Sequence, residues 1–269
     1  MEMSRIGINQ MTTRNWTLEE DIEHYAKLGI RNIGLFNFKY EGRTAEEVRD
    51  LLKAKQMHVS QVCFGGMYTG ETEEERQHAL EDTRKAIDFS KIVEADSLLI
   101  VAGPIRSHSH KQAIDLVREG LKDTVSYAEK KGVMLGLEPI HPMETSHWSV
   151  VNTIKQSLEL IDDIQSPNLG IYLDTYHIWW DTDVLSNIRA CKGKIAGVHL
   201  ADWRNPCRSF NDRTIPGRGV IHFHEMVQEF EKAVIQVYMI WSFSLKNYGR
   251  ATMKVLFGNI SIFVILCCK

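Results

Sequence analysis

Short apolar segments alternate with longer amphipathic segments along most of the chain. Runs such as SLLIVAG and KIAGVHLAD have the length of strands, and segments with apolar residues at helical spacing separate them. The pattern predicts strands near 5–9, 31–36, 58–64, 97–103, 133–139, 169–175 and 194–202, and helices near 17–28, 43–55, 73–94, 109–131, 150–164, 182–190 and 221–233. Because parallel neighbours need a crossover of a dozen or more residues, this order predicts a parallel sheet.

Seven strand–helix units and one further strand are enough to close a (β/α)8 TIM barrel, which is our predicted α/β fold. The length of 269 residues agrees with the roughly 250 residues typical of such a barrel. Thr17 and Glu20 have the spacing of a capping box, and Gly29 and Gly132 follow predicted helix ends, where a left-handed residue is favoured. No linker or repeat divides the chain, so we predict one barrel over residues 1–233.

Composition and charge exclude several classes of protein. Hydrophobic residues make up 43% and charged residues 25%, which excludes a disordered or collagen-like chain. A net charge of -3 without a basic block argues against a nucleic-acid partner and favours a small molecule. The cysteines form no CxxC pair, and the N-terminus lacks the pattern of a signal peptide. We therefore expect a cytoplasmic protein with reduced thiols and no membrane partner.

Three ionisable residues lie at the ends of predicted strands. Glu138 closes the fifth strand, Asp174 closes the sixth, and His199 lies near the end of the seventh. Because the carboxyl ends of barrel strands share one mouth, these side chains are expected to converge there. Two carboxylates and an imidazole suit Mn²⁺, Mg²⁺, Co²⁺ or Zn²⁺. The alternative is that each residue caps a helix or ends a strand as a satisfied polar group.

Other polar residues are placed to reach the same mouth. His177 follows Asp174 by three positions and could bind a substrate oxygen or act as a further ligand, while Glu144 could face the mouth or cap a helix. Arg213 lies in the loop DRTIPGRG and could hold a hydroxyl, carboxylate or phosphate, with Arg218 as the second candidate. Five aromatic residues either wall the pocket or pack in the core: Phe36, Phe64, Trp179, Trp180 and Trp203.

Four motifs occur in order at the strand ends: GLEPIHP, GIYLDTYH, VHLAD and DRTIPGRG. As a set they make the chain, as far as about residue 233, resemble the sugar phosphate isomerase/epimerase family of xylose-isomerase-like TIM barrels. That family includes ketose 3-epimerases and inosose-processing enzymes. The resemblance implies a divalent metal, Mn²⁺ foremost, bound by Glu138, Asp174 and His199.

The resemblance also implies a reaction. The substrate would be a small sugar, sugar phosphate or inosose contacted by Glu144, His177 and Arg213. Glu138 would double as the catalytic base in a proton transfer through a metal-stabilised enediolate. A homodimer or homotetramer is expected by the same resemblance.

Residues 234–269 depart from the family pattern. No Asp or Glu follows Glu231, although the chain holds 35 of them, so the Glu that the family carries on its eighth strand is missing. VIQVYMIW could still form that strand over 235–241, because it is rich in β-branched and aromatic residues. A shift of the reading frame by one nucleotide gives GYTGVYDMEFFS, which places the missing Glu at the position of Ser242. We therefore hypothesise that this altered segment arose by a single-nucleotide frameshift.

The loss of a fourth ligand at Ser242 predicts weak metal binding and little activity in an isomerase or epimerase of this kind. The alternatives are a sugar-binding barrel without turnover and a nonfunctional product. An endonuclease-IV-like phosphodiesterase is less favoured, because its tri-metal site needs more His and Glu than the early strands provide. His58, for example, begins its strand and is expected at the opposite end of the barrel.

Overall fold

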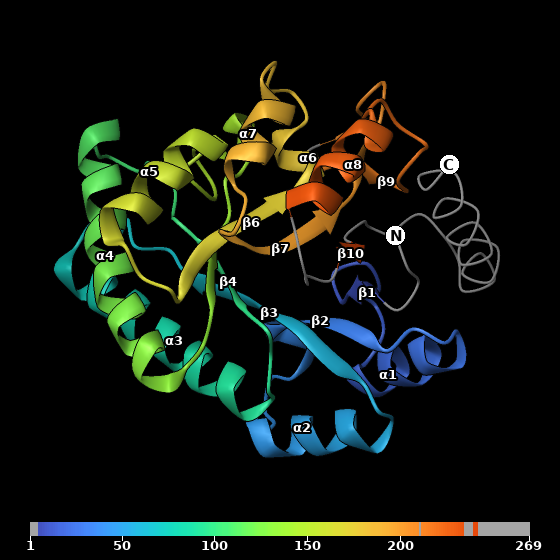
Figure 1. The fold of residues 1–269 in the computed structure, drawn as a ribbon. Helices are drawn as coiled ribbons and strands as arrows, with labels where there is room; N and C mark the ends of the chain where they lie inside the picture. The colour runs from blue at the N-terminus through green and yellow to red at the C-terminus, as the bar shows by residue number, and fades with distance from the viewer. Residues whose placement is uncertain (1–4, 210, 234–238, 242–269) are drawn as a thin grey trace.

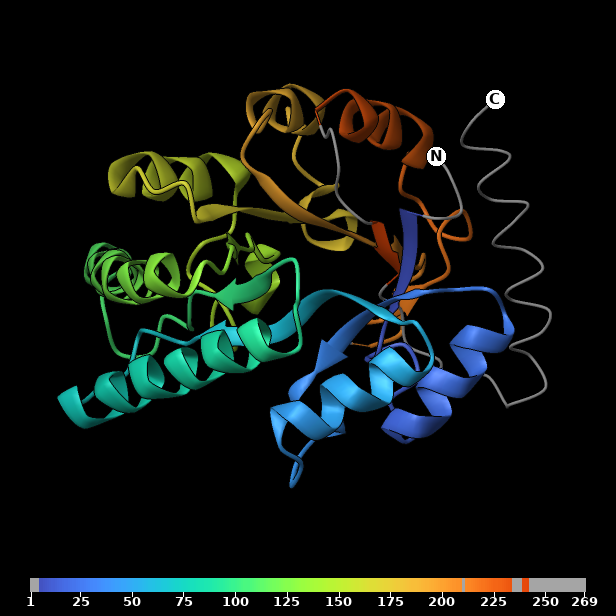
Figure 2. The same cartoon turned by 60° about the horizontal axis from the view of Figure 1, so that its bottom comes forward.

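The computed structural model describes residues 5–209, 211–233 and 239–241. Its parallel strands form a closed barrel in the order β1-β10-β7-β6-β5-β4-β3-β2, with helices around it (Figures 1 and 2). The barrel strands are β1 (Ile6–Asn9), β2 (Asn32–Phe36), β3 (His58–Gly66), β4 (Leu98–Val101), β5 (Leu135–Leu137), β6 (Leu169–Asp174), β7 (Ile195–Leu200) and β10 (Met239–Trp241). The helices are α1 (Leu18–Lys27), α2 (Ala45–Ala54), α3 (Glu73–Ile92), α4 (His110–Lys131), α5 (Ile154–Ile164), α6 (Thr175–Ile178), α7 (Val184–Ala190) and α8 (Phe223–Ala233), with short 3-10 turns η2 (Asn37–Lys39) and η3 (Pro142–Glu144).

The predicted (β/α)8 barrel is confirmed, and each predicted strand and helix overlaps an observed one. The eighth strand is β10, which falls within the predicted range 235–241. It closes the barrel by pairing Met239 with Ile6 of β1 and Ile240 with His199 of β7. The last strand of the barrel thus comes from the segment 234–269, while the origin of that segment stays a hypothesis.

The helix ends follow the predicted chemistry. The Thr17 hydroxyl accepts a hydrogen bond from the Glu20 backbone at 3.2 Å, and the Glu20 carboxylate accepts one from the Thr17 backbone at 2.9 Å. Gly132 ends α4 with φ at 67°, the left-handed conformation that costs glycine least. These caps satisfy backbone groups that a helix end would otherwise leave unpaired.

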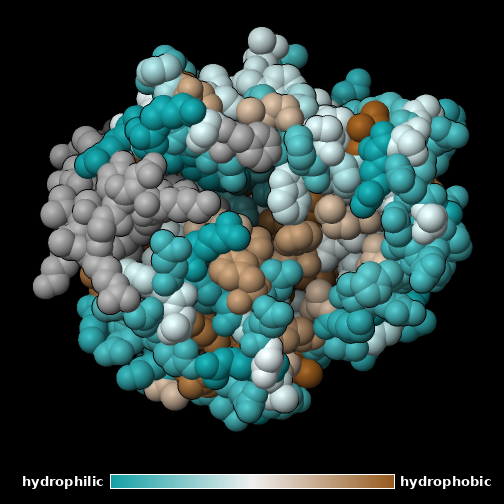
Figure 3. Space-filling model, turned by 180° about the vertical axis from the view of Figure 1, so that it is seen from behind, coloured by the Kyte–Doolittle hydropathy of each residue, from teal (hydrophilic) through white to brown (hydrophobic). Residues whose placement is uncertain are grey.

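The surface of the protein carries both hydrophilic and apolar side chains. Figure 3 shows one face as mainly hydrophilic, with apolar side chains gathered around a hollow near its middle. No helix within the described ranges is long and apolar enough to cross a membrane. Cys63, Cys191 and Cys207 are free thiols, as expected. The cellular compartment and the oligomeric state stay predictions.

One tyrosine fills the barrel interior beneath the mouth. Tyr172 of β6 is 1% exposed, and its ring centroid lies 4.7 Å from that of His199. A Cβ atom at Gly197 would lie only 2.1 Å from the Tyr172 ring, and one at Gly136 only 2.8 Å from it. Glycine at both positions therefore leaves the space that the ring occupies.

We predict that Gly197→Ala lowers the free energy of unfolding by about 1–3 kcal/mol, because the added methyl overpacks the barrel against the Tyr172 ring. Urea denaturation of the wild type and the variant measures this cost. In a Tyr172→Leu background the same substitution should cost much less, because the clashing ring atoms are gone. An equal cost in both backgrounds would contradict the account.

Candidate metal centre

The three residues predicted at strand ends lie together at the mouth of the barrel. Glu138 directly follows β5, Asp174 is the last residue of β6, and His199 belongs to β7; these strands are neighbours in the sheet. Their ligand atoms all lie within 4.8 Å of one another, and all three side chains are buried. His199 Nδ1 lies 3.3 Å from Glu138 Oε1 and 3.7 Å from Asp174 Oδ2.

The two carboxylates differ in electrostatic environment. Burial raises the pKa of Glu138 above its ordinary value, although the neighbouring His199 opposes the shift. Burial also tends to raise the pKa of Asp174, but the charge of the neighbouring Arg213 guanidinium opposes it, and the net result is a pKa below the ordinary value. Asp174 is thus the residue held anionic, while Glu138 is the one that burial makes the better proton acceptor.

Arg213 and His177 lie beside the cluster. Arg213 Nη1 donates to Asp174 Oδ2 at 2.7 Å, and its Nη2 lies 3.0 Å from His177 Nε2. The guanidinium carbon lies 4.3 Å from the centre of the Tyr176 ring, a cation–π contact. Burial lowers the pKa of His177 to about 3, so its imidazole is uncharged near pH 7. Both residues lie at the predicted mouth, whereas Arg218, the second candidate, is exposed outside it.

The position of Arg213 depends on a buried aspartate. β8 (Asp202–Trp203) pairs antiparallel with β9 (Arg213–Thr214), which brings the loop back over the barrel end. The Asp202 carboxylate accepts hydrogen bonds from the backbone of Gly217, Gly219 and Ile221 at 2.7–3.0 Å. Asp202 therefore holds the loop that carries Arg213.

A cavity of about 140 Å³ opens over the cluster. Phe36 and Phe64, two of the five aromatic candidates, line it together with Trp148, which the sequence did not suggest. Trp179 and Trp203 pack against the core instead. Trp180, the fifth candidate, does not line this cavity either. The lining of the cavity thus combines aromatic side chains with the polar residues of the cluster.

Glu144 lies in the wall of the same cavity. Its side chain is buried, at 3% exposure, and its Oε2 atom has no hydrogen-bond partner. Burial raises the pKa of Glu144 to about 7. Glu144 therefore lies at the mouth, which is one of the two placements that its sequence position left open, and this carboxyl group can hold or release a proton near neutral pH.

A family model described as a xylose isomerase-like TIM barrel matches residues 22–245. The chain belongs to this family. The match covers the cluster, the loop of Arg213 and β10, so the predicted resemblance is confirmed over most of the chain.

Curated relatives of this xylose isomerase-like barrel are distant. An L-ribulose-5-phosphate 3-epimerase of Escherichia coli is 26% identical over 161 residues, which are 59% of this chain and 53% of that protein. A D-psicose 3-epimerase of Enterocloster bolteae is 27% identical over 109 residues, or 40% of this chain and 33% of that protein. An inosose isomerase of Halalkalibacterium halodurans is 24% identical over 242 residues, or 83% and 82%. The chain thus spans about half the length of the Escherichia coli relative that it matches.

Solved structures agree on the fold. The crystal structure of a Sinorhizobium meliloti protein matches with a TM-score of 0.93 and 26% identity over 100% of both chains. The structure of the IOLI protein with a bound zinc atom matches with a TM-score of 0.84 and 16% identity over 98% of this chain and 97% of that one. At such identity the second likeness is one of fold alone.

The donors present in this xylose isomerase-like barrel fit a divalent cation. Two carboxylates and one imidazole nitrogen, all buried, present their ligand atoms to one point. Buried negative charges of like sign are costly unless a positive charge lies close, and Arg213 bonds to Asp174 rather than to Glu138. Glu138, Asp174 and His199 are therefore the residues that would hold a metal. Ser242, the position of the missing fourth ligand, lies outside the described residues.

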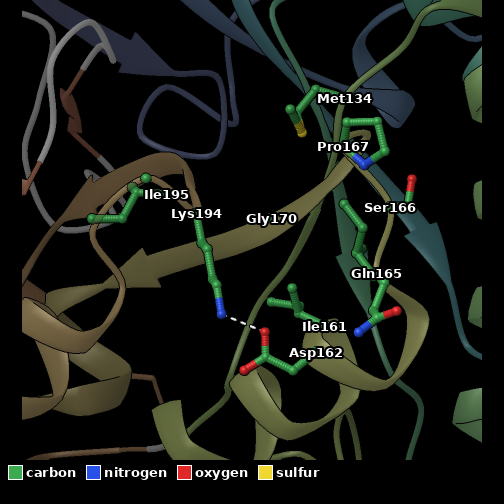
Figure 4. A pocket seen from close by; sticks show the side chains of 11 residues that line it. Met134, Ile161, Asp162, Gln165, Ser166, Pro167, Gly170, Lys194 and Ile195 are labelled. Atoms are coloured by element: carbon green, nitrogen blue, oxygen red, sulfur yellow. Dashed lines mark hydrogen bonds and ion pairs between the residues drawn. The ribbon is translucent and has the colours of Figure 1, made fainter.

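A second cavity, of about 320 Å³, lies at the opposite end of the barrel (Figure 4). It is lined by residues next to the starts of β5, β6 and β7, including Met134, Leu169 and Ile195. Lys194 forms an ion pair with Asp162 across it. This end of a TM barrel serves stability rather than chemistry, so its larger volume does not make it the candidate site.

Sequence reasoning missed several residues of the mouth. Asn9 and Trp148 line the cavity, and Gln61 contacts His199 from β3. Asn9 is the last residue of β1, and Asp202 lies two residues after the end of β7, so their positions near strand ends were available signals. Gln61 lies inside the run HVSQVCF and not at its end, so its position gave no such signal.

The raised pKa of Glu144 predicts a pH-dependent stability. Between its ordinary value of 4.5 and about 7, the folded protein keeps a proton that the unfolded chain releases. Unfolding therefore releases a proton in this window, and the stability of the wild type falls as pH rises through it. Glu144→Gln removes this titration. The free energy of unfolding of the variant, relative to that of the wild type, should therefore rise by on the order of 2 kcal/mol between about pH 4.5 and 7.5.

Urea denaturation in the presence of a chelator, repeated across this pH range, measures the difference. The exposed Glu225→Gln is the matched control and should follow the wild type at every pH. If the free energies of unfolding of the wild type and Glu144→Gln depend on pH in the same way, the pKa of Glu144 is not raised and the prediction is wrong.

Proposed function

We propose that this chain is a divalent-metal-dependent isomerase or epimerase of a small sugar, sugar phosphate or inosose. The observation that carries the proposal is the buried cluster of Glu138, Asp174 and His199 at the mouth of a xylose isomerase-like barrel. Relatives named as 3-epimerases and as an inosose isomerase support the reaction class. Mn²⁺ is the proposed metal, with Mg²⁺, Co²⁺ and Zn²⁺ as alternatives that the same donors suit.

The residues at the mouth can divide the work of a proton transfer. A bound divalent cation would supply Lewis-acid polarisation of a substrate carbonyl. Glu138, whose pKa burial raises, accepts the proton from the carbon next to that carbonyl. Asp174, kept anionic by Arg213, supplies the negative charge that holds a cation in place.

The cavity wall suits a small polyol. Glu144 offers a buried carboxyl oxygen that lacks a partner, and such an atom gains most from a hydrogen bond to a substrate hydroxyl. The neutral imidazole of His177 and the Arg213 guanidinium lie beside the cluster and supply further groups that can bond to oxygen. A volume of about 140 Å³ favours a compact substrate.

Ser242 limits the proposed activity. An epimerase needs one group to remove a proton and a second to return it on the other face, and Ser242 stands at the position that the shifted reading frame assigns to the second Glu. We infer that the altered segment 234–269 weakens metal binding and slows turnover. A sugar-binding barrel without turnover is the second candidate, and the observation that favours it is that no Asp or Glu follows Glu231 in the sequence.

The phosphodiesterase alternative has less support. Within the described ranges, Glu138, Asp174 and His199 are the one cluster able to hold a metal. His58 begins β3 and pairs with Asp96, at the end of the barrel away from the mouth. The net charge of -3 also gives phosphate backbones little attraction.

Exchange of a substrate C–H proton with solvent tests the proposed reaction. With Mn²⁺ and D-psicose, L-ribulose 5-phosphate or an inosose in D₂O, the wild type should exchange the proton next to the carbonyl, as followed by NMR or mass spectrometry. Glu138→Gln should slow this exchange at least about 100-fold, because it removes the base. The exposed Glu225→Gln is the control. Exchange at the wild-type rate in Glu138→Gln would refute the assigned role.

Restoring a carboxylate at Ser242 tests the missing ligand. Ser242→Glu should tighten Mn²⁺ binding at least about tenfold, equivalent to roughly 1.4 kcal/mol, while the uncharged Ser242→Gln should not. Isothermal titration calorimetry gives both affinities. If Ser242→Glu binds Mn²⁺ no better than the wild type, the fourth ligand does not belong at this position.

A further inference from the structure

The two ring nitrogens of His199 face different groups. Nδ1 points at the carboxylates of Glu138 and Asp174, at 3.3 and 3.7 Å. Nε2 lies 2.5 Å from the side-chain amide nitrogen of Gln61. In a neutral imidazole one nitrogen carries a hydrogen and the other a lone pair. The group that faces Nε2 therefore decides whether Nδ1 can offer a lone pair to a cation held by the carboxylates.

Gln61 reaches His199 from β3. It is fully buried, at 0% exposure, and its amide lies so close to Gly34 that a Cβ atom there would approach the amide nitrogen to 2.8 Å. The amide nitrogen also lies 3.5 Å from the sulfur of Cys63. The side chain is thus confined, with its amide against the ring of His199.

The other end of the Gln61 amide is unpaired. Its Oε1 atom is buried and has no hydrogen-bond partner, an arrangement that costs the desolvation of a polar group. A half-turn of the amide exchanges its nitrogen and oxygen, which are nearly equal in size. After that turn, Oε1 can accept a hydrogen bond from Nε2–H of His199. The unpaired oxygen is then satisfied, and the imidazole lone pair is placed on Nδ1.

We propose that Gln61 is a positioning residue for His199. Its carbonyl accepts the Nε2–H hydrogen bond and so keeps the Nδ1 lone pair directed at the point shared with Glu138 and Asp174. This inference rests on the proposed metal site. Glutamine suits the task because one orientation of its amide donates to Nε2 when Nδ1 carries the proton, and the other accepts when Nδ1 binds a cation.

Metal affinity tests the proposal. Gln61→Met keeps the volume and loses both hydrogen-bonding groups, and it should weaken Mn²⁺ binding about 10- to 100-fold by titration calorimetry. Gln61→Glu keeps an acceptor for Nε2–H and should bind Mn²⁺ within about threefold of the wild type or more tightly. Wild-type affinity in Gln61→Met would overturn the proposal.

Ser60→Ala is the matched control on the same strand. The Ser60 hydroxyl is buried and donates to the Ile33 backbone carbonyl at 3.1 Å, so its partner lies on β2 and not in the metal cluster. Its removal therefore costs β3 a buried hydrogen bond without disturbing His199, and Mn²⁺ affinity should not change. An equal loss of affinity in Ser60→Ala and Gln61→Met would reduce the effect to strand stability and overturn the proposal.

The state of the His199 ring gives a second readout that needs no metal. The ¹⁵N shifts of a labelled imidazole report which nitrogen carries the hydrogen. In the metal-free protein these ¹⁵N shifts should differ from those of the wild type in Gln61→Met and should equal them in Ser60→Ala. In Gln61→Glu, which can only accept, Nε2 must carry a hydrogen; an unprotonated Nε2 there, or unmoved shifts in Gln61→Met, would overturn the proposal. Failure of the wild type to bind Mn²⁺ would instead defeat the proposed function, and the ring measurement keeps the two outcomes apart.

Discussion

Two carboxylates, Glu138 and Asp174, are buried side by side at the ends of neighbouring strands. The surrounding residues are arranged to offset the free-energy cost of burying these charges. Ionised groups removed from water are expensive, and two of like sign raise the expense further. Arg213 bonds to Asp174, while His199 lies within hydrogen-bonding distance of Glu138. A divalent cation at the same point would neutralise both carboxylates, which is why the proposed function and the electrostatics agree.

Several parts of the fold fix the positions of these charged side chains. Asp202 ties the loop of Arg213 to the barrel end through backbone hydrogen bonds. Tyr172 fills the interior below His199, in space that Gly197 leaves free. Gln61 faces the remaining nitrogen of the imidazole. The site is thus built from rigid strands and one anchored loop, as a preorganised site requires.

The fold and the centre of the site were readable from the sequence for a common physical reason. In a parallel barrel every strand end meets one mouth, so Glu138, Asp174 and His199 could be placed together without knowledge of the register. The residues around these three could not be placed in this way. Gln61 lies inside β3 and not at its end, and its contact with His199 across the barrel depends on which side chains of β3 point inward. The contribution of Trp148 depends on the path of a loop that no short pattern specifies.

The central claim is that Glu138, Asp174 and His199 hold a divalent cation at the mouth of the barrel. Crystals soaked in Mn²⁺ and measured for anomalous scattering test it most directly, because the signal locates the metal without reference to activity. The account predicts one strong peak within bonding distance of the Glu138 and Asp174 carboxylates and of His199 Nδ1. Crystals that show Mn²⁺ only elsewhere, or a peak ligated by His199 Nε2, would contradict it.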